Sequence, residues 1–108
     1  MFEFEFTKDR REVTIRVQDK KFDITSAADF REQVGKNWSD TVENVVMDFS
    51  RVEYVDSSGV GALVSVHKRV AEKGNAVTIL NPCPAVLSVI ELLRLHRVFS
   101  LVTRDTAR

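Results

Sequence analysis

The feature that most constrains this fold is the regular alternation of strand-like and helix-like segments after residue 40. Val45–Met47, a short run without polar alternation, and Ala76–Leu80 predict buried strands, and Val98–Val102 predicts the last strand. Helical patterns separate these runs: one follows Asp56 and stops at Gly74-Asn75, and another begins near Pro84. Strands that alternate with helices pair in parallel through right-handed crossovers. The pattern therefore predicts an α/β domain.

The first forty residues predict a hairpin and then a helix. Phe and Glu alternate over Phe2–Phe6, and apolar and polar residues alternate over Val13–Val17, as in half-buried antiparallel strands. An apolar stripe with helical spacing follows, formed by Ala27, Phe30, Val34 and Trp38. Ser26 and Asp29 have the spacing of a capping box at its start. We expect a mixed sheet of about five strands, mostly parallel with an antiparallel N-terminal hairpin, packed against three main helices.

Length and composition restrict the classes of protein that fit. The 108 residues suit a single domain over 1–108, with a weakly structured tail from about residue 103. Sixteen basic and sixteen acidic residues cancel, which argues against binding nucleic acid or a membrane surface by bulk attraction. One cysteine, Cys83, and two histidines, His67 and His96, are too few for a disulfide or a zinc site. We expect Cys83 to be a buried thiol, no metal or cofactor, and a cytoplasmic protein.

Asp56–Gly59 is the segment with candidate chemistry, because it lies where a strand gives way to a helix. A serine at a helix start accepts a hydrogen bond from a free amide, but one serine is enough for that task. Two serines followed by glycine leave a second hydroxyl without a required local partner. The segment is thus either a plain helix cap or a cap with a functional hydroxyl.

The helix that follows has an apolar face and a polar face. A spacing of 100° per residue places Ser58 on the polar side, in line with Ala62, Ser65 and Arg69 and flanked by Val66. This polar stripe is either an ordinary solvated surface or a surface that a partner binds. A phosphate on Ser58 would add about −1.5 to −2 charges at a helix N-terminus. Asp56 would repel it, so phosphorylation would change the local potential on an unchanged backbone.

The run Val45–Ser50 followed by Val55–Leu63 resembles the STAS domain, in particular the single-domain anti-sigma factor antagonists of bacteria. The resemblance extends from about Phe2 to Val102, and Asp56–Gly59 is its most specific part. It implies a non-enzymatic, phosphorylation-switched binding module that controls transcription. The unphosphorylated protein would sequester an anti-sigma factor that is also a Ser kinase, and would thereby free the sigma factor. Phosphorylation would release the kinase, and a metal-dependent Ser/Thr phosphatase would reset the switch.

The resemblance also implies roles for individual residues. Ser58 would accept the phosphate, with Ser57 as second choice for the acceptor and otherwise a cap or neighbour. Asp23 and Asp56 would surround the site, together with Ser57 and Gly59. The partner would contact a surface made of Ser58, Ala62, Ser65, Val66 and Arg69. The protein would be a monomer or weak dimer, without contact to nucleic acid or membrane.

Other interpretations keep or change the class of function. With the same fold, the chain could be a STAS subunit of a lipid transporter or of a stress-sensing complex. An enzyme with Ser58 as nucleophile and His67 or His96 as base lacks a Gly-x-Ser-x-Gly elbow, and His67 falls on the apolar face. We expect His67 to be packed. A receiver domain phosphorylated on Asp48 would need more acids for its magnesium ion, so we expect Asp48 to cap the turn into Ser50.

Overall fold

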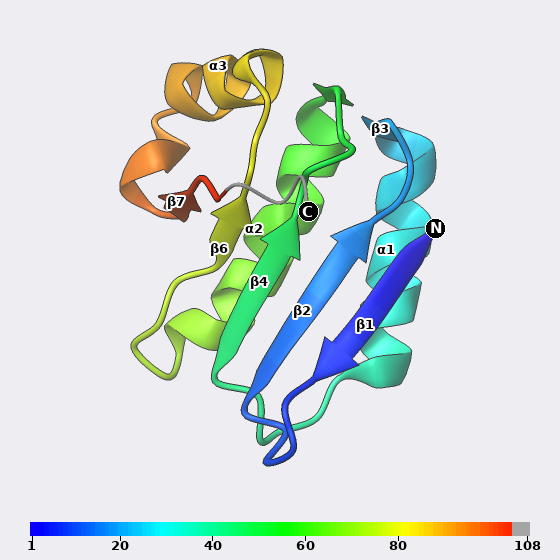
Figure 1. Ribbon diagram of the computed structural model, residues 1–108, viewed down its shortest axis with the longest axis vertical. Coiled ribbons are helices and arrows are strands. Elements are labelled where there is room, and N and C mark those ends of the chain that lie inside the picture. Colours follow the sequence, from blue (N-terminus) through cyan, green and yellow to red (C-terminus); the bar gives the residue numbers. More distant parts are fainter. Residues whose placement is uncertain (105–108) are drawn as a thin grey trace.

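A five-stranded sheet forms the centre of the computed structural model, which describes residues 1–104 (Figure 1). In spatial order its strands are β1 (Phe2–Phe6), β2 (Glu12–Val17), β4 (Asn44–Asp48), β6 (Thr78–Leu80) and β7 (Ser100–Val102). β1 and β2 are antiparallel, and the other neighbours are parallel. The predicted mixed sheet with an antiparallel N-terminal hairpin is therefore confirmed. Of the predicted tail, residues 103–104 have no regular structure, and residues 105–108 lie outside the described part.

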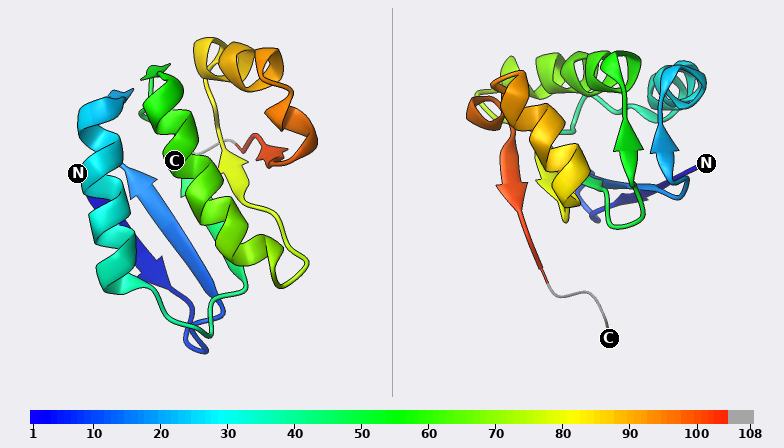
Figure 2. Two further views of the ribbon diagram at one scale, coloured as in Figure 1. Left: turned by 180° about the vertical axis from the view of Figure 1, so that it is seen from behind. Right: turned by 90° about the horizontal axis from the view of Figure 1, so that it is seen from above.

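Three α-helices accompany the sheet, as predicted. They are α1 (Ile24–Asn37), α2 (Ser57–Ala71) and α3 (Pro84–Leu92), and a 3₁₀ helix, η1 (Leu95–Arg97), follows α3. α1 and α2 lie side by side over one face of the sheet, whereas α3 crosses one end of the molecule (Figure 2). Within residues 1–104, no helix covers the opposite face of the sheet (Figure 2), and none has the length and apolar character that crossing a membrane requires.

A second, two-stranded sheet was not predicted. β3 (Lys21–Phe22) pairs in parallel with β5 (Tyr54–Val55). The backbone N–H groups of Glu53 and Tyr54 extend the contact by donating to the Lys20 carbonyl, at 2.7 and 3.1 Å. Strands of two residues are too short to show a periodic pattern in a sequence. The pairing matters because β3 leads directly into α1 and β5 into α2.

An aromatic cluster holds the start of α1 on the sheet. Phe22, Phe30 and Phe49 are fully buried. The ring of Phe22 lies 5.3 Å from that of Phe30 and 5.5 Å from that of Phe49, edge to face in both cases. Phe2 of β1 joins them, 5.2 Å from Phe30. Edge-to-face pairs add about 0.5–1.5 kcal/mol beyond their burial, so β3 is anchored through its side chain.

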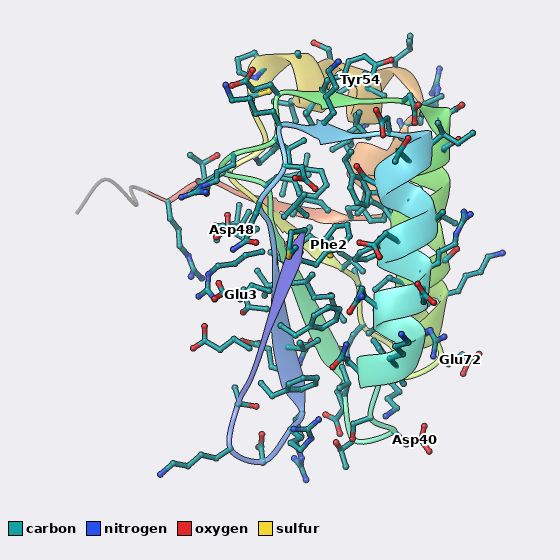
Figure 3. The ribbon with its side chains drawn as sticks, turned by 90° about the vertical axis from the view of Figure 1, so that its right-hand side faces the viewer. Phe2, Glu3, Asp40, Asp48, Tyr54 and Glu72 are labelled. Carbon is teal, nitrogen blue, oxygen red and sulfur yellow. The ribbon has the colours of Figure 1, made fainter. Side chains whose placement is uncertain are left out.

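The helix-free face of the sheet carries charged side chains beside a few apolar ones. Figure 3 shows Phe2 directed toward the helices and Glu3 directed away from them, as the alternation in β1 predicts. On this face, Arg16 of β2 lies 2.7 Å from Glu5 and 3.4 Å from Glu3. The hydrogen bond that Arg16 donates to Glu5 raises the pKa of Arg16, so its guanidinium stays charged. Asp48 also lies on this face (Figure 3).

Two local predictions about chain turns are confirmed. Asp48 Oδ1 accepts from the backbone N–H of Ser50 at 3.0 Å and from its hydroxyl at 2.6 Å, so Asp48 stabilises that turn. Gly74 has a φ of 81°, and the Asn75 N–H donates to the Val70 carbonyl at 3.1 Å. A left-handed glycine therefore ends α2 as predicted.

Candidate functional site

The N-termini of α1 and α2 lie next to each other at one end of the molecule, and both helices run away from that end (Figure 2). The pairing of β3 with β5 causes this arrangement, because each strand ends one residue before the cap of its helix. The two N-cap residues are Asp23 and Asp56, both with extended backbone. The structure thus brings together two carboxylates that lie far apart in the sequence.

Asp56 links the two helices. Its Oδ1 accepts from the N–H of Gly59 in its own helix at 3.0 Å. Its Oδ2 accepts from the N–H of Ile24, the first residue of α1, at 3.3 Å. A helix start leaves amide donors unpaired, and a carboxylate can satisfy two of them at once. A serine has only one side-chain oxygen, which explains why an aspartate suits this position.

Asp23 caps α1 alone. Its Oδ1 accepts from the N–H groups of Thr25 and Ser26 at 3.1 and 3.3 Å. The predicted capping box of Ser26 with Asp29 is therefore wrong. Ser26 already lies inside the helix, and its hydroxyl donates to the Lys21 carbonyl at 2.8 Å. The helix begins earlier than the box requires because Asp23 supplies the cap.

Ser57 and Ser58 are the first two residues of α2. Because Asp56 is the cap, the prediction that a serine caps this helix is wrong, and Ser57 is a neighbour of the cap. Within residues 1–104, neither serine hydroxyl has a hydrogen-bond partner. Ser57 is exposed and Ser58 is half-buried. The site therefore presents two hydroxyls near the surface that the local structure does not use.

Gly59 allows the close contact between α2 and β3. A Cβ atom at this position would lie 2.1 Å from the carbonyl oxygen of Phe22 and 2.8 Å from Cγ2 of Val55. Both distances are shorter than van der Waals contact. The first involves a backbone oxygen, which cannot move away by a change of rotamer. The glycine that follows the serines is therefore required by packing of the first turn of α2, whatever the serines do.

The predicted polar stripe of α2 is only partly a surface. Ser65 and Arg69 are exposed, but Ala62 and Val66 are 0% and 2% exposed, so the prediction that a partner contacts these two is wrong. Val66 lines a hollow with residues of α1, and Ala62 lies one turn earlier on the same side. α1 covers this side of α2 while the sheet covers another, so the buried arc is wider than one amphipathic face.

Two exposed apolar side chains flank the serines, and the sequence did not single them out. Ile24 is 68% exposed and Tyr54 is 50% exposed. Figure 3 shows Tyr54 at the end of the molecule at which α1 begins. In the sequence, Ile24 falls outside the apolar stripe of α1, and Tyr54 precedes the buried Val55. Both side chains therefore offer apolar surface near the starts of the two helices.

His67 is not placed to activate Ser58. His67 is half-buried, with its ring edge to face with that of Phe99 at 5.7 Å, as expected of a packed histidine. It lies nine residues beyond Ser58 in the same helix, which corresponds to about 13 Å along the axis. His96 is exposed in η1. Cys83 is half-buried rather than buried, because it occupies the N-cap position of α3.

Known proteins resemble this chain in sequence and in fold. A STAS-domain containing protein of Pseudomonas aeruginosa (strain UCBPP-PA14) is 25% identical over 93 residues, which cover 86% of this chain and 90% of that protein. A Thermotoga maritima protein described as an anti-sigma factor antagonist has a TM-score of 0.80 at 20% identity, covering 98% of this chain and 89% of that one. The Bacillus cell fate determinant SpoIIAA, in its phosphorylated form, has a TM-score of 0.72 at 22% identity, covering 99% of this chain and 96% of that one.

The two solved structures show the shared fold, and a family model extends the match to the sequence. The model that describes the STAS domain matches residues 4–107, nearly the whole chain. The match includes both helix starts described above, with Asp23, Asp56 and the two serines. The chain therefore belongs to the STAS domain family.

Proposed function

We propose that this protein is an anti-sigma factor antagonist: a binding module without catalysis of its own that phosphorylation of Ser58 switches off. It binds an anti-sigma factor while Ser58 is unphosphorylated and releases it when Ser58 carries a phosphate. The anti-sigma factor is itself the Ser kinase, and a metal-dependent Ser/Thr phosphatase restores the binding form. The names of similar proteins support this proposal, since SpoIIAA is called an anti-sigma factor antagonist and has a phosphorylated form.

The observation that carries the proposal is that Asp56, and not the serines, makes the hydrogen bonds at the start of α2. Asp56 supplies both cap hydrogen bonds, to Gly59 and to Ile24. The hydroxyl of Ser58 has no hydrogen-bond partner in residues 1–104, so a phosphate there breaks no contact of the folded chain. Modification can then change the surface without changing the scaffold.

Electrostatics explains why such a phosphate would act as a switch. It adds about −1.5 to −2 charges beside the carboxylates of Asp23 and Asp56. The helix N-terminus offsets only about half a charge. The local potential becomes strongly negative, and a partner docked on Ile24 and Tyr54 must then face that charge at close range.

Phosphorylation of the purified chain by the anti-sigma factor kinase of the same organism tests the acceptor. With ATP, the wild type and Ser57→Ala should each gain one phosphate, about 80 Da by intact-mass measurement. Ser58→Ala should gain none. Complete phosphorylation of Ser58→Ala would contradict the assignment.

Titration calorimetry with the same kinase tests the switch. Ser58→Ala should bind as tightly as the wild type, because the hydroxyl makes no contact that the fold needs. Ser58→Asp should bind about tenfold more weakly, since like charges oppose docking. Unchanged affinity of Ser58→Asp would contradict the electrostatic switch, and no binding by the wild type would favour a STAS subunit of a transporter or stress-sensing complex.

A further inference from the structure

A hollow of about 210 Å³ lies between α1 and α2. The described residues that line it are Phe30, Arg31, Val34, Ser65, Val66 and Arg69. Its apolar floor is buried, since Phe30, Val34 and Val66 are at most 3% exposed. Its walls, Arg31 from α1 and Arg69 from α2, are exposed. The hollow is therefore a short groove with an apolar base and a cationic group on each side.

The two arginines have no carboxylate partners. Within residues 1–104, no carboxylate oxygen lies within 4.0 Å of either guanidinium, whereas Arg16 on the sheet pairs with three acids. None of the described residues that line the groove is acidic. Two acids, Asp40 and Glu72, line a neighbouring hollow that Arg69 also borders. A chain with no net charge thus leaves two positive charges unpaired along one groove.

Both guanidinium groups are held near the groove. That of Arg69 lies over the ring of Trp38, 5.0 Å from its centroid, a favourable cation–π contact. That of Arg31 rests against α2, where a Cβ on Gly61 would lie 3.2 Å from Nη2. Groups that are already positioned lose less conformational freedom when a ligand binds. A planar guanidinium also matches a carboxylate in two parallel hydrogen bonds.

We propose that this groove binds an acidic helix of the partner protein. A glutamate or aspartate of that helix pairs with Arg31 and Arg69, and an adjacent apolar side chain of the same helix enters the mouth of the hollow between them. An amphipathic helix can lay its apolar face into such a groove, and it presents an anchor and a charge one turn apart.

The inference rests on the proposed function, because the partner is the protein that phosphorylation of Ser58 releases. Ser65 is seven residues beyond Ser58 in α2, which corresponds to about 10 Å along the helix axis. A phosphate on Ser58 therefore lies close to the end of the groove that is nearest the N-terminus of α2. The phosphate would repel an acidic partner helix and attract a basic one. Because the positive charge of the groove selects an acidic helix, it accounts for release on phosphorylation.

Charge reversal in the groove tests the partner. In titrations with the purified anti-sigma factor kinase, Arg31→Glu and Arg69→Glu should each weaken binding about tenfold, while their melting temperatures stay close to that of the wild type. Lys68→Glu is the matched control, because it makes the same charge change on the residue before Arg69 without lining the groove. If wild type binds and Ser58→Asp is released, but the arginine variants bind like the control, the proposed function stands and the groove inference is overturned.

A peptide titration tests the groove even if that kinase does not bind. The probe is a synthetic helical peptide of about 15 residues with glutamates on both sides of a leucine stripe, added to ¹⁵N-labelled protein. Amide shifts should concentrate at Arg31, Val34, Ser65 and Arg69 and disappear in Arg31→Glu/Arg69→Glu. Absence of shifts, or equal shifts with inorganic phosphate or with a lysine version of the peptide, would overturn the proposal.

Discussion

At the scale of single residues, Gly59 matters more than its size suggests. The carbonyl of Phe22 lies where its Cβ would be, at 2.1 Å, so Gly59→Ala must push α2 away from β3. We expect this change to lower the free energy of unfolding by about 3 kcal/mol, measured by denaturant titration.

Gly35 provides the matched control, since a Cβ there meets no atom within 4 Å. Because Gly35 lies in the interior of α1, Gly35→Ala should raise the free energy of unfolding by about 1 kcal/mol. Effects of the same sign and size at both glycines would show that Gly59 is not a packing requirement.

His67 is a residue whose replacement should stabilise the fold. Its Nδ1 is buried and has no hydrogen-bond partner in the described chain, and a buried polar atom without a partner destabilises. His67→Leu removes that atom and favours the helix, so we expect the free energy of unfolding to rise by about 1 kcal/mol. Thermal melts would check this, with the exposed His96→Leu as control, expected within about 0.5 kcal/mol of wild type. A lower melting temperature for His67→Leu would contradict the account.

At the scale of elements, Asp56 makes the start of α2 depend on the start of α1. Asp56→Ala removes the acceptors of both Gly59 and Ile24 and should lower the free energy of unfolding by about 2 kcal/mol. Asp56→Ser keeps one side-chain oxygen for its own helix, so we expect about half that loss, together with a changed amide shift of Ile24 in NMR spectra. A Ser variant as stable as wild type, with the Ile24 amide unmoved, would mean that the link between the helices contributes nothing.

The sequence predicted the long elements of this fold and was less informative about the helix start. Phe2–Phe6 and the helix after Asp56 have clear periods, which is why they were predicted. Asp56, Ser57 and Ser58 are all residue types that favour the cap position, so local preference cannot choose among them. The choice follows from Gly59, which must face β3 for α2 to pack, and that contact is tertiary.

At the scale of the whole molecule, the proposed switch should leave the fold intact. Ser58 makes no side-chain hydrogen bond in residues 1–104, so Ser58→Asp should change the free energy of unfolding by less than about 0.5 kcal/mol. Denaturant titration and circular dichroism of wild type and variant would check this. A large loss of stability would replace the electrostatic switch with local unfolding of α2.

The candidate site could be predicted in part. The serines and Asp56 were singled out from the residues themselves and Asp23 from the family resemblance, and the structure places all four at one end of the molecule. The coverage of Ala62 and Val66 by α1 could not be foreseen, because a small or apolar residue beside a polar face does not reveal a second helix. The groove between Arg31 and Arg69 arises only when two distant helices meet.

The ribbon of β3 and β5 has a consequence for how an enzyme could reach Ser58. Two residue pairs and two further hydrogen bonds to the Lys20 carbonyl join these strands, and the N–H groups of Gly59 and Val60 hold the first turn of α2 by bonding to Asp56. Segments of this kind open locally at a free energy well below that of global unfolding. Amide hydrogen exchange at Gly59 and Val60, whose N–H groups bond to Asp56, should then be faster than in β4. If the first turn unwound transiently, the segment with the serines could enter the cleft of a kinase while the rest of α2 stayed folded.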